Sequence, residues 1–480
     1  MQPTSCCDEA RKTNGHKVLW IRSHARSAFV QISDTLSRVT RLTYDDDLFL
    51  RMECVLDVPV VNQIVWRFDA PIERDDLHSM WKHLSEGPID RAVQRVRVPG
   101  ARDKWIKAST SLPLDVHPAT LGAADLAEWL EERAAVPLDP FGGPVWQLAY
   151  TTVEGGGSAL SLVASHIVGD GGALTSAAMA AARGPADPED FRSVWDDVVP
   201  HDVKDAFGQI GAATSGIARA LGRTVRGTLA PAQKKVEQPP APIKAVEPMS
   251  FGVFAPSTVV VDCPSEQWST AASSVGGSAN SLLVAVALGI LTASGRVRES
   301  DSVKVSLPVS TRVTGDVRAN ATSGVSIQVD GGGEFRNDLG PIRRDSKTAF
   351  TTLADTAHST TFELTKPLMQ MLPDAIVARA AKSATAPLCL CSNLGDRGRA
   401  LRTIGGVDAR SVAMRSITQN TTAELLRRTK GGVSVWWNIS GETSTLCVTG
   451  LDPDLFPSRE HLRGLIEAEY ERWQLTPTFW

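Results

Sequence analysis

The sequence has no long apolar run and no signal that would carry the chain across a membrane. No stretch of its 480 residues contains the roughly 18 consecutive apolar residues that a membrane-spanning helix needs. The N-terminus lacks the continuous apolar core and the small-residue cleavage site of a secretory signal. These absences predict a cytoplasmic protein, and they leave peripheral contact with a membrane or a lipid droplet open.

The chain also lacks an excess of one charge and a regular spacing of cysteines. Its formal charge is -4, and no basic run carries interleaved aromatic residues, so nucleic acid is not expected as a partner. The seven cysteines are odd in number, widely scattered and free of Cys-x-x-Cys pairs, which favours reduced thiols over a disulfide framework or a zinc site. We expect no metal, and we expect Cys389 and Cys391 to pack on one face of a strand.

The length is too great for one ordinary hydrophobic core and predicts two domains or two similar lobes. An apolar fraction of 42% supports folding throughout. Residues 1–40 are weakly patterned and form an arm of unknown role, and residues 231–249 are rich in Pro, Lys, Ala and Glu, as in an extended linker. We therefore predict an N-terminal lobe over 41–230 and a C-terminal lobe over 250–480.

Hydrophobic periodicity predicts helices and strands in both lobes, and hence a mixed α/β fold. Strands are expected over 60–68, 94–98, 105–107, 159–164, 258–262, 303–309, 387–394, 433–439 and 445–448. Helices are expected over 74–85, 123–135, 173–182, 265–274, 280–294 and 458–472, and over most of 337–385.

Two charged segments each have a structural and a functional interpretation. The acidic triplet 45–47 could hold a cation, but a solvated helix start is favoured because carboxylates stabilise helix N-termini. Residues 203–229 predict a helix with Lys204, Arg219, Arg223 and Arg226 on its polar face. Such a helix could lie on an anionic lipid surface or pack against its own domain. Its glycines weaken an isolated helix and favour packing.

The stretch SHIVGDGG, residues 165–172, holds the residues best suited to chemistry. It follows an expected buried strand and precedes a segment of small helix-forming residues. His166 is therefore presented at the end of a rigid strand, and the glycines let a substrate approach its ring. An imidazole with an ordinary pKa of about 6.5 suits proton removal at neutral pH. The structural alternative is a buried histidine that is hydrogen-bonded to a carbonyl group.

This stretch resembles the His-His-x-x-x-Asp-Gly motif of the condensing acyltransferases. That superfamily includes nonribosomal peptide condensation domains, polyketide-associated acyltransferases and bacterial wax ester synthase/diacylglycerol acyltransferases. Ser165 stands in place of the first histidine, while His166, Asp170 and Gly171 match the motif. Because the second histidine of the motif is the catalytic one, the resemblance implies that His166 is the catalytic base.

Further segments resemble the wax ester synthase/diacylglycerol acyltransferase family in the same order. Residues 137–139 (PLD) and 144–146 (PVW) resemble its Pro-Leu-Asp and Pro-Leu-Trp segments. Residues 308–312 (PVSTR) resemble its Pro-Val-Ser-x-Arg strand end. Asn320 falls at its Gly-Asn pair, with alanine in place of the glycine, and residues 392–393 match its Ser-Asn pair.

The resemblance implies two chloramphenicol-acetyltransferase-like lobes, each a mixed sheet with helices, joined by a crossover linker around a substrate channel. It implies a structural ion pair between Asp170 and Arg312 that shapes the catalytic loop, with Gly171 as part of the same motif. The channel residues that it implies are Ser165, Asn320, Ser392 and Asn393.

The implied activity is transfer of a fatty acyl group from acyl-CoA to a long-chain alcohol or a diacylglycerol. His166 would act as general base without a covalent intermediate, which agrees with the lack of a Gly-x-Ser-x-Gly nucleophile elbow. Acyl-CoA would be a substrate, and no cofactor is implied. The alternative is a tailoring or condensation-type enzyme that uses acyl-CoA or an acyl carrier protein with a specialised alcohol or amine acceptor.

Three other interpretations compete with acyl transfer. The sequence GDGG between a strand and a helix partly imitates a dinucleotide-binding turn, but Leu174 stands where a small residue is expected. A serine hydrolase would need a nucleophile, and only the histidine and the acid are placed. A non-catalytic protein could use the channel to bind a lipid or a carrier protein.

Overall fold

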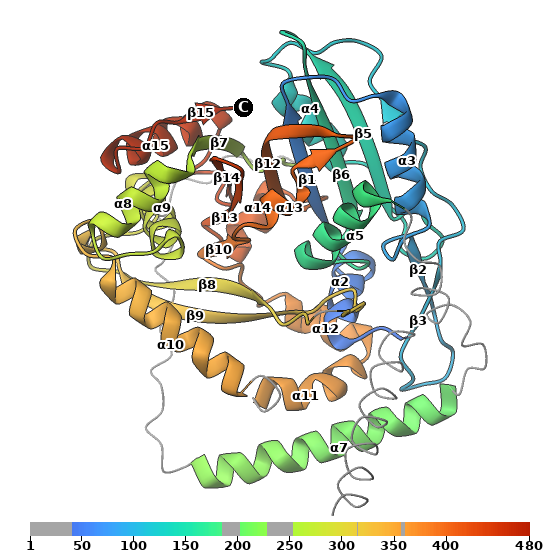
Figure 1. Cartoon of the computed structure of the whole chain (residues 1–480). Helices are drawn as coiled ribbons and strands as arrows, with labels where there is room; N and C mark the ends of the chain where they lie inside the picture. The colour runs from blue at the N-terminus through green and yellow to red at the C-terminus, as the bar shows by residue number, and fades with distance from the viewer. Residues whose placement is uncertain (1–40, 185–201, 228–252, 314, 357–360) are drawn as a thin grey trace, which may run out of the picture.

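The chain folds into two lobes, each built on one large sheet with helices packed against it (Figure 1). The computed structural model describes residues 41–184, 202–227, 253–313, 315–356 and 361–480. The arm predicted at 1–40 and the linker predicted at 231–249 lie outside these ranges. The mixed α/β class with two sheet-containing lobes, expected from the sequence, is confirmed.

The N-terminal lobe has a six-stranded sheet in the order β11-β12-β1-β6-β5-β4. Its central strands are buried at nearly every position because helices cover both faces of the sheet. Helices α3 and α5 cover one face and α4 the other. The elements contributed by residues 41–184 are α2 (Tyr44–Cys54), β1 (Val60–Phe68), α3 (Arg74–Ser85), β2 (Arg91–Gln94), β3 (Lys104–Lys107), β4 (Asp115–Val116), α4 (Leu126–Ala134), β5 (Trp146–Val153), β6 (Gly157–Ser165) and α5 (Gly171–Arg183).

The C-terminal lobe has a seven-stranded sheet in the order β15-β7-β14-β13-β10-β8-β9. Its core helix is α9, which is buried from Ser281 to Leu291 between the sheet and the surrounding helices. The strands are β7 (Thr258–Pro264), β8 (Ser302–Ser310), β9 (Thr322–Asp330), β10 (Cys389–Asn393), β13 (Val433–Ser440), β14 (Thr443–Gly450) and β15 (Thr478–Phe479). The helices are α8 (Ser265–Ser274), α9 (Ala279–Ala293), α10 (Gly340–Thr356), α11 (Thr361–Gln370), α12 (Asp374–Ala381), α13 (Arg397–Leu401), α14 (Ala423–Thr429) and α15 (Arg459–Arg472).

One pair of strands crosses from the C-terminal half of the chain into the N-terminal sheet. Strand β12 (Val407–Thr418) pairs antiparallel with β1, and β11 (Thr403–Ile404) extends the same edge. Residues 403–418 therefore depart from the predicted partition, which assigned all of 250–480 to the C-terminal lobe. The physical reason is the open edge of β1, whose backbone N–H and C=O groups are paired by the incoming strand.

Strand β10 carries both cysteines that the sequence placed on one face. Cys389 and Cys391 are buried, and their sulfur atoms lie 3.7 Å apart. Their predicted role as packing residues is confirmed. Each thiol is surrounded by the apolar core of the C-terminal lobe.

Helix α7 (Asp202–Gly227) packs one face against α11, which belongs to the predicted C-terminal lobe, so it contacts more than the domain on which it was expected to pack. Ala206, Ala213 and Ala220 are buried at seven-residue intervals along that face. A methyl group at Gly216 would collide with the carbonyl oxygen of Leu364, so the two helices approach closely. Among the described helices none is long and apolar enough to cross a bilayer alone, and only the pair α8 and α9, bent by 87°, meets the criterion together.

Candidate active site

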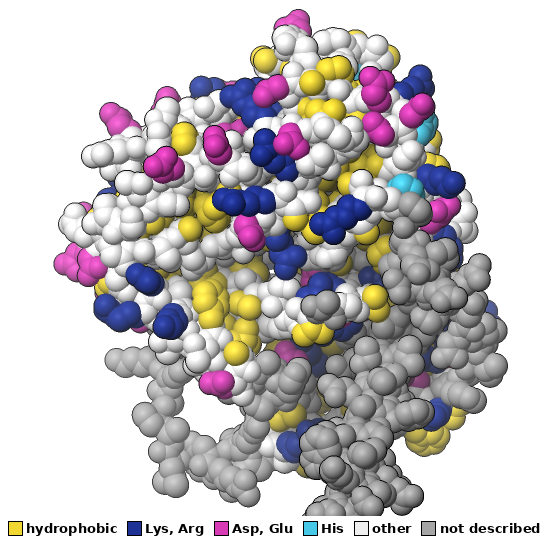
Figure 2. All heavy atoms as spheres, viewed as in Figure 1, with side chains coloured by type: hydrophobic (Ala, Val, Ile, Leu, Met, Phe, Trp, Pro, Cys, Tyr) yellow, Lys and Arg dark blue, Asp and Glu magenta, His cyan; other side chains and the backbone are white. Residues whose placement is uncertain are grey.

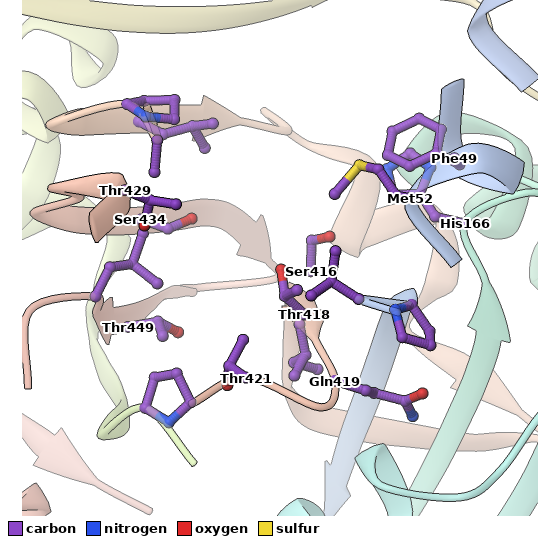
Figure 3. A pocket seen from close by; sticks show the side chains of 18 of the residues that line it. Phe49, Met52, His166, Ser416, Thr418, Gln419, Thr421, Thr429, Ser434 and Thr449 are labelled. Carbon is purple, nitrogen blue, oxygen red and sulfur yellow. The ribbon is translucent and has the colours of Figure 1, made fainter. Parts of the chain in front are cut away.

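A cavity of about 1260 Å³ lies between the lobes, and the loop formed by residues 165–172 opens on it. Helix α2 forms one wall, and strands β8, β10 and β13 contribute to the other. Figure 3 shows Phe49, Met52 and His166 grouped at one end of the cavity. Of the site residues predicted from the sequence, the cavity wall contains His166, Asp170, Gly171, Asn320, Ser392 and Asn393.

His166 follows directly after β6 and contacts both lobes. Its backbone N–H donates to the carbonyl oxygen of Val60 in β1 at 2.8 Å, which fixes its place at the edge of the sheet. Its ring Nδ1 lies 3.0 Å from Oδ1 of Asn320, a residue of the loop between β8 and β9. The structure therefore brings together two predicted site residues that are 154 positions apart in the sequence.

The surroundings of Asn320 determine which end of its amide faces the histidine. Its Nδ2 donates to the backbone carbonyls of His166 and Ile167, both at 3.1 Å, and to Oδ1 of Asp46 at 2.9 Å. All three partners are acceptors, so the amide nitrogen must face them and the amide oxygen must face the ring. Nδ1 of His166 therefore carries the ring proton, and Nε2 is the nitrogen with a free lone pair.

The imidazole ring is also held from one side by an aromatic residue of α2. Phe49 stacks on His166 with ring centroids 3.6 Å apart and an angle of 16° between the planes. Burial lowers the pKa of His166 below its ordinary value and outweighs the nearby carboxylate of Asp170, which acts in the opposite direction. The ring is therefore neutral at neutral pH.

Asp170 joins the histidine loop to the C-terminal lobe through both oxygens of its carboxylate. Oδ1 accepts hydrogen bonds from the backbone N–H of Ala173 and from the guanidinium of Arg312, both at 2.8 Å. Oδ2 accepts from the backbone N–H of Ala321 at 2.7 Å and from the hydroxyl of Thr322 at 2.8 Å. The ion pair expected from the sequence is present, and both of its side chains are buried.

The pKa of Asp170 reflects these partners. Burial alone would raise it, but Arg312 and the hydrogen-bond donors outweigh burial and lower the pKa of Asp170 below its ordinary value. Arg312 in turn donates to the carbonyl oxygens of residues 316, 318 and 319, so the pair also holds the β8–β9 loop in shape. Asp170 is ionised at neutral pH and does not hydrogen-bond the ring of His166.

Gly172 lets the loop approach its neighbours closely. A β-carbon at Gly172 would lie 3.2 Å from Oδ1 of Asp170 and 3.3 Å from Nε of Arg312, so a side chain there would press on the ion pair. A β-carbon at Gly171 would make only an ordinary van der Waals contact, 3.5 Å from the ring of Trp436. The tight position is therefore Gly172, next to the ion pair.

The acidic triplet at the start of α2 differs from the prediction of a solvated helix start. Thr43 and Asp46 do form a capping box, as a helix start should, but Asp46 and Asp47 are buried. Oδ1 of Asp46 accepts from both the backbone N–H and the Nδ2 of Asn320. Burial raises the pKa of Asp46, and the buried guanidinium of Arg91 acts in the opposite direction. Asp46 thus supports Asn320, while Asp47 pairs with Arg51 at 2.7 Å and Asp45 pairs with Lys366 at 2.9 Å.

Ser165 also differs from its predicted place in the substrate channel. It is buried at the end of β6, and its hydroxyl accepts a hydrogen bond from the backbone N–H of Ile167 at 3.3 Å. It does not line the cavity. Asn393 lines the cavity but uses its Oδ1 to accept from the N–H of Gly395, and Ser392 also belongs to the cavity wall.

Sequence reasoning missed four residues that shape the site. Phe49 and Asp46 lie on α2, and Ser416 and Thr418 lie at the end of β12 on the cavity wall. Local sequence gives no signal for them, because each reaches the site through a contact distant in the chain.

Among the described residues, no group of three or more His, Cys, Asp or Glu side chains is arranged to hold a metal ion.

Breaking the buried pair should destabilise the fold. Asp170→Ala and Arg312→Ala should each lower the free energy of unfolding by about 3 to 5 kcal/mol, because each leaves a buried charge without its partner. The double variant should lose less than the sum of the two, and urea unfolding of all four proteins measures the difference. Strict additivity would contradict the assignment of a structural pair.

Comparison with known proteins gives matches in structure alone. No family model and no curated protein matches the sequence. The trichothecene 15-O-acetyltransferase TRI3 from Fusarium sporotrichioides matches with a TM-score of 0.56 and 11% identity, over 90% of this chain and 94% of that one. The wax ester synthase/diacylglycerol acyltransferase from Marinobacter aquaeolei VT8 matches with a TM-score of 0.53 and 13% identity, over 91% of this chain and 99% of that one.

A third match is the condensation domain from the Monacolin K polyketide synthase MokA. Its TM-score is 0.54 at 13% identity, over 90% of this chain and 96% of that one. At these identities the likeness concerns the fold, and it extends over both lobes. The chain has the fold of the condensing acyltransferase superfamily.

Proposed function

We propose that this protein is an acyltransferase that moves a fatty acyl group from acyl-CoA to an alcohol, either a long-chain alcohol or a diacylglycerol. The observation that carries the proposal is the neutral His166, whose Nδ1 is bound to Asn320 in the cavity between the lobes. A buried imidazole with a lowered pKa and a fixed tautomer is a general base ready at neutral pH.

The reaction needs one proton to move twice. Nε2 of His166 takes the proton of the acceptor hydroxyl as its oxygen attacks the thioester carbonyl, so that a carbon–oxygen bond forms. When the tetrahedral intermediate collapses, the carbon–sulfur bond breaks and His166 returns the proton to the leaving thiolate. In the described part of the chain no serine or cysteine side chain hydrogen-bonds the His166 ring, which favours direct attack over a covalent acyl-enzyme.

The wall of α2 supports a long apolar substrate. Leu48, Phe49 and Met52 of this helix line the cavity close to the catalytic end, and Val55 and Leu56 extend the wall directly after the helix. Because burying a methylene group contributes about 0.8 kcal/mol, an apolar wall of this extent can hold a fatty chain firmly. The volume of about 1260 Å³ exceeds what a short acyl group needs.

A polar acceptor is the second candidate substrate. It is favoured by hydroxyl groups of β10 and β12 that line the cavity. Thr418 lies opposite Val60 in the pairing of β12 with β1, so its Cα is two strands, or about 10 Å, from His166. Over the described residues, the hydroxyls of Ser392, Ser416 and Thr418 have no hydrogen-bond partner in the protein and can bind a substrate. These groups suit a specialised alcohol or amine, with the acyl group on CoA or on a carrier protein.

A direct assay separates these candidates. The purified protein is incubated with palmitoyl-CoA and either hexadecanol or a diacylglycerol, and free CoA and ester are measured. Ester formation supports the lipid acyltransferase. Ester formation only with palmitoyl carrier protein, or only with a polar alcohol or amine, supports the tailoring enzyme. Donor binding without turnover on any acceptor would support the binding-only interpretation.

Removing the base should abolish most of the turnover. His166→Ala should lower kcat about a hundred- to ten-thousand-fold, because a positioned general base contributes that much to a proton transfer. Donor binding and the free energy of unfolding should change little. His83→Ala, which removes a histidine outside the cavity, is the matched control, and near wild-type turnover of His166→Ala would rule out the assignment.

The pH dependence of kcat/KM should report the lowered pKa of His166. The base works only in its neutral form, so activity should fall as the pH drops through the pKa of the ring. Because burial lowers this pKa, the acid limb should lie below the ordinary value of about 6.5. A limb at or above that value would show that the ring is not buried and neutral in the free enzyme.

Asn320 should act as a positioning residue. Asn320→Ala removes the acceptor that holds the Nδ1 proton and should lower kcat about ten- to a hundredfold with little change in KM. Asn62→Ala is the matched control, because Asn62 is also buried and donates to the carbonyl of Gly169 at 2.9 Å but does not touch the ring. Equal losses of kcat in the two variants would point to a general loosening of the loop.

A further inference from the structure

Helix α7 lies at the edge of the molecule, beyond α11 and away from both sheets (Figure 1). Its alanine face is buried against α11, but a second face carries large apolar side chains that nothing described covers. Their exposed fractions are 58% for Val203, 70% for Phe207, 44% for Ile210 and 61% for Leu221. Figure 2 shows apolar side chains exposed in the lower part of the molecule, where α7 and α11 lie in Figure 1.

The spacing of these residues places them on one stripe. Val203, Phe207, Ile210 and Leu221 fall within a narrow sector of the helix at 3.6 residues per turn. The stripe spans about 27 Å at 1.5 Å per residue. The half-buried Ile217 marks its border with the alanine face that packs on α11, and no described residue covers the exposed side chains of the stripe.

The charges around the stripe have one sign. Both acids of α7 are used within the molecule, because Asp202 pairs with Arg41 at 2.6 Å and Asp205 pairs with Arg102 at 2.7 Å. Lys204 and Arg219 are exposed, and neither has an acidic partner among the described residues. A second copy of the helix would bring the same cations together, which disfavours a dimer through this face.

We propose that the stripe on α7 docks the protein on the surface of an anionic lipid bilayer. The apolar side chains would enter the boundary between headgroups and acyl chains. Lys204, about a quarter turn from the stripe, would meet the anionic headgroups, and Arg219 lies farther round on the polar face. An apolar face beside an exposed cationic face is the pattern of helices that lie in the plane of a membrane surface.

The position of α7 connects this surface with the cavity. Helix α11 lies between α7 and α2, and Lys366 of α11 pairs with Asp45 of α2 at 2.9 Å. Leu48 on α2 is 42% exposed and also lines the cavity. Docking through α7 would therefore bring the α2 side of the cavity close to the lipid that holds a water-insoluble acceptor. This last consequence rests on the proposed function, whereas the docking itself does not.

Vesicle binding tests the proposal on the full chain without any acyl transfer. The protein should co-sediment with phosphatidylcholine vesicles that contain a quarter phosphatidylglycerol, and more weakly with phosphatidylcholine alone. Phe207→Ser combined with Ile210→Ser should raise the lipid concentration for half binding about tenfold or more. Lys204→Gln combined with Arg219→Gln should weaken binding to the anionic vesicles alone, by about fivefold for each charge.

Two further measurements keep the proposal falsifiable if a serine variant misfolds. The tryptophan fluorescence gained in Phe207→Trp should be quenched by brominated lipid in the same vesicles. The fluorescence gained in Val116→Trp, on the edge strand β4, should not be quenched. Val116→Ser serves as the matched control for binding, since Val116 is 40% exposed on another element.

Binding that survives both double substitutions would overturn the proposal. A lipid-free dimer that Phe207→Ser with Ile210→Ser converts to monomer would also overturn it, and would assign the stripe to an interface between copies. Intact vesicle binding without acyl transfer would instead count against the proposed function and leave the docking surface in place.

Discussion

The carboxylate of Asp170 is the interaction on which the site depends. Asp170 binds both sequence neighbours of Asn320: its backbone N–H donates to the carbonyl of Ala319 at 3.0 Å, and its Oδ2 accepts from the N–H of Ala321 at 2.7 Å. Asn320 is thereby held in place through both of its sequence neighbours. Its amide oxygen in turn sets the tautomer of the His166 ring. Asp170 thus positions the ring of His166 through the asparagine that contacts it.

Charge balance explains how this arrangement stays buried. Two carboxylates, Asp46 and Asp170, lie near two guanidinium groups, Arg91 and Arg312, and all four are shielded from solvent. Burial lowers the pKa of Arg91 to about 10, so it remains charged at neutral pH. Since Arg312 offsets the charge of Asp170, and burial lowers the pKa of His166, the imidazole stays neutral beside that carboxylate.

Elements defined by local periodicity were predictable, and elements defined by distant pairing were not. The predicted bounds of β1 and α3 agree with the structure, because alternation and helical spacing are local signals. Strand β12 was not expected, since its sequence VDARSVAMRSIT mixes small and charged residues and becomes a strand by pairing with β1. In the same way the sequence places Asp46 at a helix start, but only the fold buries it against Asn320.

Ser165 takes no part in the hydrogen bond or the ring stacking that hold the imidazole of His166. The first position of the motif is buried at the end of β6, where its backbone N–H donates to the carbonyl of Val145 and its hydroxyl accepts from the N–H of Ile167. A side chain there cannot reach the cavity, so its identity affects the turn that follows the strand. The ring of His166 is positioned instead by Phe49 and Asn320, neither of which contacts Ser165 through a hydrogen bond. Replacing the first histidine by serine therefore leaves every described contact of the imidazole in place.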